Sequence, residues 1–115
     1  MNIHHYETIG GKDLILAYID RLGNIEKAKG LFILKRLQDE GLSVLDTLDT
    51  RQLRKKLWEI KFFENNRFMY IVVDDQNLYI VHACKKQKGK AEKFELGKAI
   101  KRVRELEKEL GIALI

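Results

Sequence analysis

The chain has 115 residues, of which 45% are hydrophobic and 34% are charged. These values suit one globular domain over residues 1–115, and they exclude a disordered chain or separate catalytic and regulatory modules. The single cysteine, Cys84, excludes an intrachain disulfide. No leader-like segment opens the sequence and no apolar run approaches membrane-spanning length, so we expect a cytoplasmic protein.

The net charge of +5 is concentrated towards the end of the sequence. Residues 1–84 contain twelve basic and twelve acidic side chains, whereas residues 85–115 contain ten basic and five acidic ones. A concentrated basic patch favours polyanions such as nucleic acid. A solvated lysine-rich surface explains the same pattern equally well.

The first half of the sequence predicts a short strand and a pair of helices. The strand covers residues 3–9 and ends at two glycines. Apolar side chains at helical spacing predict helices over residues 14–22 and 24–40, joined at Gly23 and stopped by Gly41. A polar stretch, residues 46–54, follows the helix pair.

The second half of the sequence changes to the period of two that is typical of strands. Alternating aromatic and β-branched residues predict strands over residues 57–64, 67–73 and 78–84. Asn65-Asn66 indicates a tight hairpin turn, and residues 74–77 form a second turn. A last helix over residues 92–110 has one apolar face. The order of helix pair, antiparallel meander and C-terminal helix predicts an α+β fold.

A two-residue turn at Asn65-Asn66 fixes the register of the first hairpin and places Lys61 opposite Tyr70. Strand alternation then puts Lys61, Tyr70 and Lys85 on one face, a mixture of cations and aromatic rings that suits RNA. The same register puts an apolar set on the other face: Trp58, Ile60, Phe62, Met69, Ile71, Ile80, His82 and Cys84. Alternatively, the last helix covers the cationic face, and for Phe63 and Phe68 a core position is the better interpretation.

Three motifs in this region, in this order, resemble the phage-derived HigB branch of the RelE/ParE toxin superfamily. They are Leu57-Trp58-Glu59-Ile60-Lys61, Arg67-Phe68-Met69-Tyr70 and Ile80-Val81-His82-Ala83-Cys84-Lys85-Lys86. The resemblance covers roughly residues 45–110 and lies in the order and spacing of the three motifs. Lys61 stands where the family usually has arginine, and Gln87-Lys88-Gly89-Lys90 replaces its usual Lys-Thr-Pro run.

The resemblance implies a RelE-like toxin of a type II toxin–antitoxin system, which cuts messenger RNA on the ribosome without a metal or cofactor. The ribose 2′-hydroxyl would attack the adjacent phosphate, so cations must stabilise charge and a side chain must move protons. The candidate catalytic residues are Lys61, Arg67, Tyr70, His82, Lys85 and Lys86, and the candidate RNA-binding residues are Lys55, Lys56, Lys88 and Lys90. His82 suits proton transfer because an imidazole titrates near neutral pH, although a lone histidine on an apolar face is more often a hydrogen-bonded core residue.

The expected partners are the ribosome, messenger RNA and a cognate antitoxin. The resemblance implies a HigA-like helix-turn-helix antitoxin, through which the toxin would bind operator DNA indirectly. A ParE-like poison of DNA gyrase without nuclease chemistry is the first alternative, because it shares the fold. The second is a non-enzymatic nucleic-acid-binding module that uses only the basic patch.

Overall fold

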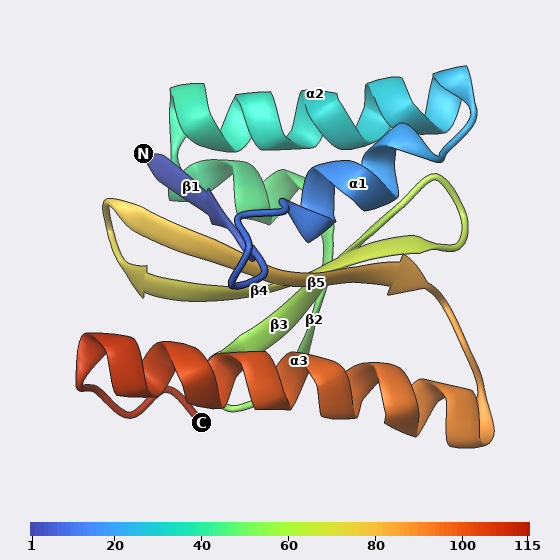
Figure 1. The fold of residues 1–115 in the computed structure, drawn as a ribbon. Helices are drawn as coiled ribbons and strands as arrows, with labels where there is room; N and C mark the ends of the chain where they lie inside the picture. Colours follow the sequence, from blue (N-terminus) through green and yellow to red (C-terminus); the bar gives the residue numbers. More distant parts are fainter.

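Five strands form one mixed sheet with helices on both faces in the computed structural model, which describes residues 1–115 (Figure 1). The strand order is β1-β5-β4-β3-β2; β1 pairs with β5 in parallel, and all other pairs are antiparallel. The strands are β1 Asn2–His5, β2 Asp49–Arg54, β3 Leu57–Phe62, β4 Asn66–Asp74 and β5 Asn77–Lys85. The helices are α1 Leu14–Asp20, α2 Asn24–Glu40, the 3-10 helix η1 Leu42–Thr47 and α3 Gly89–Leu110.

The helices form two separate layers, with α1 and α2 on one face of the sheet and α3 on the other (Figure 1). The Asp13 carboxylate begins α1 by accepting hydrogen bonds from the backbone N–H groups of Ile15 and Leu16, at 3.0 and 2.9 Å. Gly111 ends α3 in the left-handed conformation, at φ 68°. None of the helices combines the length and the apolar character that a bilayer span requires.

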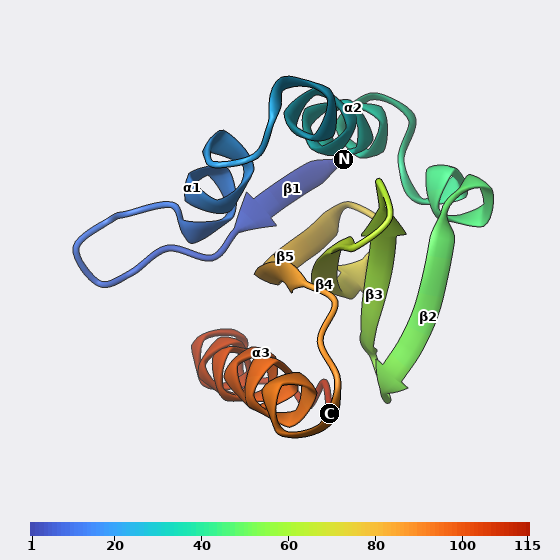
Figure 2. The same cartoon turned by 90° about the vertical axis from the view of Figure 1, so that its right-hand side faces the viewer.

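The α+β prediction is confirmed, and the layout is consistent with a RelE-like fold. The helix pair, the three-stranded meander and the C-terminal helix lie where the sequence predicts them. The polar stretch after the helix pair contains one further strand, β2, at the sheet edge beside β3 (Figure 2). An edge strand tolerates charged side chains because one of its sides faces solvent, so its sequence lacks the usual strand pattern.

The predicted register of the β3–β4 hairpin is wrong by three residues. Lys61 lies opposite Arg67, and Trp58 lies opposite Tyr70. The turn consists of residues 63–65, with Phe63 and Glu64 in the left-handed region at φ 41° and 66°. Asn66 is not in the turn.

Asn66 explains this shift because its side chain is fully buried and hydrogen bonded on the helix-pair side of the sheet. Its Oδ1 accepts a hydrogen bond from the Tyr18 hydroxyl at 2.6 Å, and its Nδ2 donates to Glu26 at 2.8 Å. A buried amide must find such partners. The side chain therefore belongs to the first position of β4, and the turn moves towards β3.

The shift by an odd number of residues redistributes the side chains between the two faces of the sheet. Lys61 and Tyr70 lie on opposite faces, so the predicted cation–aromatic face is wrong. Ile60 and Ile71 are both buried, but in different cores, and Trp58 is 36% exposed. A bulge at Val81 in β5 further separates Ile80, on the helix-pair side, from His82 and Cys84.

Both faces of the sheet are therefore core faces. The core under α1 and α2 includes Ile15, Leu37, Ile60, Phe68 and Ile80. The core under α3 includes Leu57, Met69, Ile71, Val103 and Leu106. The position of Phe68 confirms its assignment to a core, whereas Phe63 is 38% exposed in the turn.

Candidate functional site

A fully buried arginine, Arg67, lies on the α3 face near the start of β4. Its guanidinium donates to Glu59 of β3 at 2.8 Å and to both carboxylate oxygens of Glu92 in α3, at 2.8 and 2.6 Å. Burial opposes the charge of Arg67, but the hydrogen bonds to Glu92 and Glu59 raise its pKa, so the side chain stays cationic. The hydrogen bond from Arg67 in turn lowers the pKa of Glu92.

Glu59 is also fully buried, and three cations approach it. Besides the contact with Arg67, Oε1 of Glu59 lies 2.9 Å from Nε of Arg51 in β2 and 4.0 Å from Nζ of Lys86. The ion pair with Arg51 does not have the geometry of a hydrogen bond, so Oε1 of Glu59 remains without a hydrogen-bond partner. Nε of Arg67 also has no hydrogen-bond partner. The network of Arg67, Arg51 and Lys86 with Glu59 and Glu92 thus carries one more positive than negative charge, and its hydrogen bonds are not fully satisfied.

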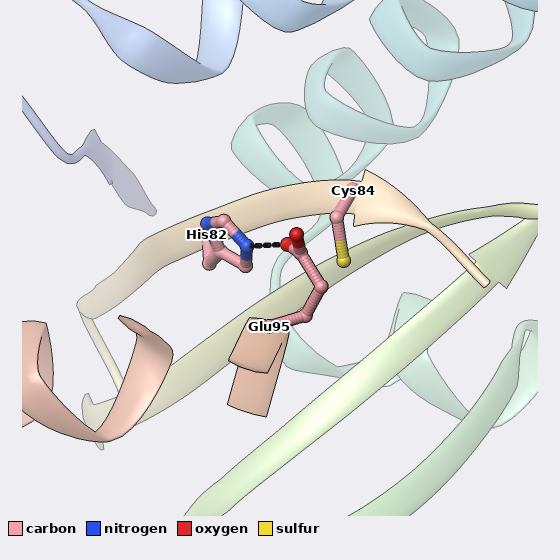
Figure 3. A group of neighbouring side chains, drawn as sticks. All are labelled: His82, Cys84 and Glu95. Carbon is pink, nitrogen blue, oxygen red and sulfur yellow. Dashed lines mark hydrogen bonds and ion pairs between the residues drawn. The ribbon is translucent and has the colours of Figure 1, made fainter. Parts of the chain in front are cut away.

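His82 lies on β5 under the same helix, beside Glu95 (Figure 3), and both of its ring nitrogens have partners. Arg102 of α3 donates to Nδ1 at 2.9 Å, and Nε2 contacts the Glu95 carboxylate. Because a guanidinium only donates, Nδ1 accepts and the ring proton lies on Nε2, directed at Glu95. Burial lowers the pKa of His82, which keeps the ring neutral.

Cys84 lies beside this pair, with its thiol directed towards Glu95 (Figure 3). The ligand atoms of His82, Cys84 and Glu95 lie within 4.8 Å of one another, a spacing that Zn²⁺ accepts. However, Nε2 carries the ring proton and so has no lone pair for a metal. Burial raises the pKa of Cys84 to about 12, so its sulfur stays a thiol, whereas a metal binds the thiolate. In this arrangement His82 and Glu95 form a hydrogen-bonded pair beside a protonated thiol rather than an open set of metal ligands.

Two lysines complete a cationic group around Arg67. Lys61 lies directly opposite Arg67 on the neighbouring strand and makes no ion pair, and Lys86 follows β5 and approaches Glu59. Lys88 and Lys90, at the exposed start of α3, lie within four residues of Glu92. The fold thus gathers five candidate cations around the buried network: Lys61, Arg67, Lys86, Lys88 and Lys90.

The fold does not bring the remaining candidates to this group. Tyr70 is buried on the helix-pair face, where burial raises its pKa to about 12. Lys85 pairs with Glu26 of α2 at 3.0 Å, so it points to the opposite side from Lys86. Lys55 and Lys56 lie in the β2–β3 turn, at the other end of β3 from Lys61, roughly 17 Å along the strand.

A surface hollow lies elsewhere, between the N-terminal segment and α3. It contains His4 and His5, each hydrogen bonded through one ring nitrogen, to Asn77 at 2.8 Å and to Asp13 at 2.9 Å. Its charged lining is mainly acidic, with Arg102 as its one cation, so it does not suit a phosphate group. We place the candidate site at the buried network instead, because charge and proton-carrying groups converge there.

The sequence interpretation missed the acidic half of this site. It gave no place in the site to Glu59, which pairs with Arg67, Arg51 and Lys86. It did not consider Glu92, Glu95 or Arg102 at all. Their spacing was the available signal, because positions 92, 95, 99, 102, 103 and 106 continue one face of a helix into its first turns.

The fold and the site together define a class: a small basic α+β protein that is consistent with a RelE-like fold and has a cationic group beside a histidine under its last helix. Residues 17–104 match the family described as Phage derived protein Gp49-like (DUF891), which is most of the chain. The chain belongs to this family, which is related to the RelE- and HigB-type toxins. No curated protein matches the chain.

Proposed function

We propose that the protein is the toxin of a type II toxin–antitoxin pair and cuts messenger RNA on the ribosome. The observation that carries this proposal is the convergence of Lys61, Arg67 and Lys86 beside His82 on one face, in a chain of the Gp49-like family. A cleavage that starts from the ribose 2′-hydroxyl requires positive charge at the phosphate and proton transfer at two oxygens.

Each residue has a role that its chemistry allows. Arg67 holds two phosphate oxygens through its planar guanidinium, as it holds both oxygens of Glu92 in this structure. Lys61 and Lys86 stabilise the charge that develops on the phosphorane. His82 accepts the proton of the attacking 2′-hydroxyl at Nε2 once Arg102 releases Nδ1 and the ring proton moves to that nitrogen. Lys88 and Lys90 attract the RNA chain from the exposed start of α3.

The proposed partners are translating ribosomes and an acidic antitoxin that covers part of the cationic face. Charge complementarity favours that surface over the helix pair. An antitoxin with a helix-turn-helix domain would also carry the toxin to operator DNA.

Brief induction of the chain alone, followed by mapping of 5′ ends across all messages, tests the proposal. We expect growth arrest and new 5′ ends inside translated messages, and neither effect in a Lys61→Ala/Lys86→Ala variant. Lys29→Ala, an exposed lysine on α2 that makes no ion pair, is the control and should behave as the parent chain. Arrest accompanied by a DNA-damage response, without cuts in messages, would favour a gyrase poison instead.

A further inference from the structure

The first turns of α3 are attached to the rest of the protein differently from its later turns. The buried residues of α3 are Ala99, Val103 and Leu106, all at or after the middle of the helix. Residues 89–98 include no buried side chain. Their polar contacts with the sheet are made by Glu92, which pairs with Arg67, and by Glu95, which pairs with His82, and their apolar contact with the core under α3 is made by the partly buried Leu96.

The two acidic contacts occupy the groups that the proposed reaction needs. The Glu92 carboxylate takes both arms of the Arg67 guanidinium, the same geometry that two phosphate oxygens would adopt. The Glu95 carboxylate accepts a hydrogen bond from the Nε2–H group of His82. With both acids in place, Arg67 is fully buried and His82 is 6% exposed, so neither reaches a substrate.

The same segment also has local features that favour its release. Gly89 begins α3 at φ 60°, and the N-cap residue Lys88 makes no side-chain capping hydrogen bond. Gly97 lies inside the helix, where glycine is unfavourable, and a Cβ there would meet no atom within 4 Å. Beneath the segment, the network leaves Nε of Arg67 and Oε1 of Glu59 without hydrogen bonds.

We propose that residues 89–97 are a cover held closed by two carboxylates, which unwinds to exchange Glu92 and Glu95 for a phosphodiester of single-stranded RNA. The apolar half of α3 stays packed and holds the opened segment in place. In the open form Arg67 and His82 join Lys61 and Lys86 in one accessible phosphate site. This inference rests on the proposed function for its ligand, but the opening itself does not depend on that function.

The single cysteine provides a direct measurement of opening without RNA. The Cys84 thiol is 6% exposed and lies next to Glu95, so Ellman's reagent reaches it only when the cover opens. We expect Glu92→Gln to increase the labelling rate about ten- to a hundredfold, the effect of weakening a hydrogen-bonded charge pair. Gly97→Ala should decrease the rate about fivefold, because alanine stabilises the helical form. Glu109→Gln, on the exposed end of α3 and outside any ion pair, removes the same charge and should leave the rate unchanged.

Binding of a fluorescent single-stranded RNA with 2′-O-methyl riboses, which cannot be cut, then tests the ligand at fixed salt. The apparent affinity should follow the open population, so Glu92→Gln should bind more tightly and Gly97→Ala more weakly by factors like those of labelling. Circular dichroism melting confirms that each variant is folded.

The outcomes separate the two parts of the inference. Labelling rates that respond to neither Glu92→Gln nor Gly97→Ala would overturn the cover and with it the roles given to Arg67 and His82. The toxin assignment would then rest on the partly exposed Lys61 and Lys86, and the mapping of cuts in messages tests it separately. Labelling that responds, with RNA affinity that does not, would overturn the phosphate role of this face and the proposed function with it.

Discussion

Both faces of the sheet are buried under helices, but the buried side chains on the two faces differ in polarity. Under α1 and α2 the core consists of apolar side chains. Its one buried polar residue, Asn66, lies at the start of β4 and is hydrogen bonded to Tyr18 and Glu26. Under α3 the apolar core covers only part of the sheet, and the rest holds Glu59, Arg67 and His82. Three of the four buried polar or charged residues thus lie under one helix.

This difference indicates that the two faces serve different purposes. Removing charges from water costs several kcal/mol for each ion, and well-packed apolar residues of similar volume often stabilise a protein as well or better. The face under α1 and α2 has the composition expected of a stabilising core. The face under α3 retains charges at a cost in stability, which is typical of sites where charge is used.

The largest expected effect is a loss of stability on the apolar face. Phe68 is fully buried there and contacts Phe62, with ring centroids 4.6 Å apart. Phe68→Ala should lower the free energy of unfolding by about 3–5 kcal/mol, measured by urea denaturation. Phe68→Leu is the control and should cost much less, because it fills most of the same space. A loss below about 1 kcal/mol for the alanine variant would contradict the role of this face.

Charge removal on the α3 face should separate stability from activity. Arg67→Met alone leaves the buried Glu59 with only its ion pairs to Arg51 and Lys86 and leaves Glu92 without a partner, and it should cost about 3–5 kcal/mol in the free energy of unfolding. Replacing Arg67, Glu59 and Glu92 together by methionine should restore parental stability to within about 1 kcal/mol, yet abolish toxicity. A triple variant that remains as unstable as the single one would show that this network is needed for folding.

The lysines near Arg67 should affect reaction rate rather than folding. Lys61→Ala and Lys86→Ala should each lower the cleavage rate by an amount equivalent to about 2–4 kcal/mol, since they stabilise charge in the transition state. Their free energies of unfolding should stay within about 0.5 kcal/mol of the parent. Lys88→Ala and Lys90→Ala should instead weaken ribosome binding and reduce its salt dependence. If all four lysine variants weakened ribosome binding equally, Lys61 and Lys86 would have no separate role in the chemical step.

His82 should make stability depend on pH. Because burial lowers the pKa of His82, the unfolded chain takes up a proton at a higher pH than the folded chain. Stability is therefore complete well above the ordinary pKa of 6.5 and falls as the pH is lowered through it. Denaturation curves at pH 7.5 and 5.5 measure the loss, which His82→Gln should remove. A loss of equal size in that variant would assign the effect to other groups.

The smallest expected effect concerns Tyr70, on the face opposite the lysines. Tyr70→Phe keeps the ring in the core, so cleavage should stay within about twofold of the parent and stability within about 1 kcal/mol. A tenfold or greater loss of cleavage would show that this tyrosine reaches the substrate, contrary to its position.

The sequence predicted the order and type of the elements because periodicity is a local property. Helices, meander and C-terminal helix follow from patterns within a few residues of one another. The faces of the sheet could not be predicted as securely, because the turn between β3 and β4 depends on Asn66. That residue contacts Tyr18 and Glu26, 48 and 40 positions away, and no local pattern contains this information. The β5 bulge at Val81 has the same effect on His82.

The candidate site was predicted in part for the same reason. Lys61, Arg67, His82 and Lys86 were named from motifs, and the fold places all four on the α3 face. Their acidic partners come from β3 and from the first turns of α3, which only the tertiary structure brings together. Tyr70 and Lys85 were grouped with these cations through the wrong register.

The central claim is that the chemistry occurs on the face under α3, and cleavage of one message on purified translating ribosomes tests it most directly. Two matched double variants, one for each face, are compared with the parent chain by primer extension. Lys61→Ala/Lys86→Ala should lose cleavage by at least a hundredfold, whereas Tyr70→Phe/Lys85→Ala should cut at the parental rate and positions. The reverse result, with cleavage lost only in Tyr70→Phe/Lys85→Ala, would contradict the account.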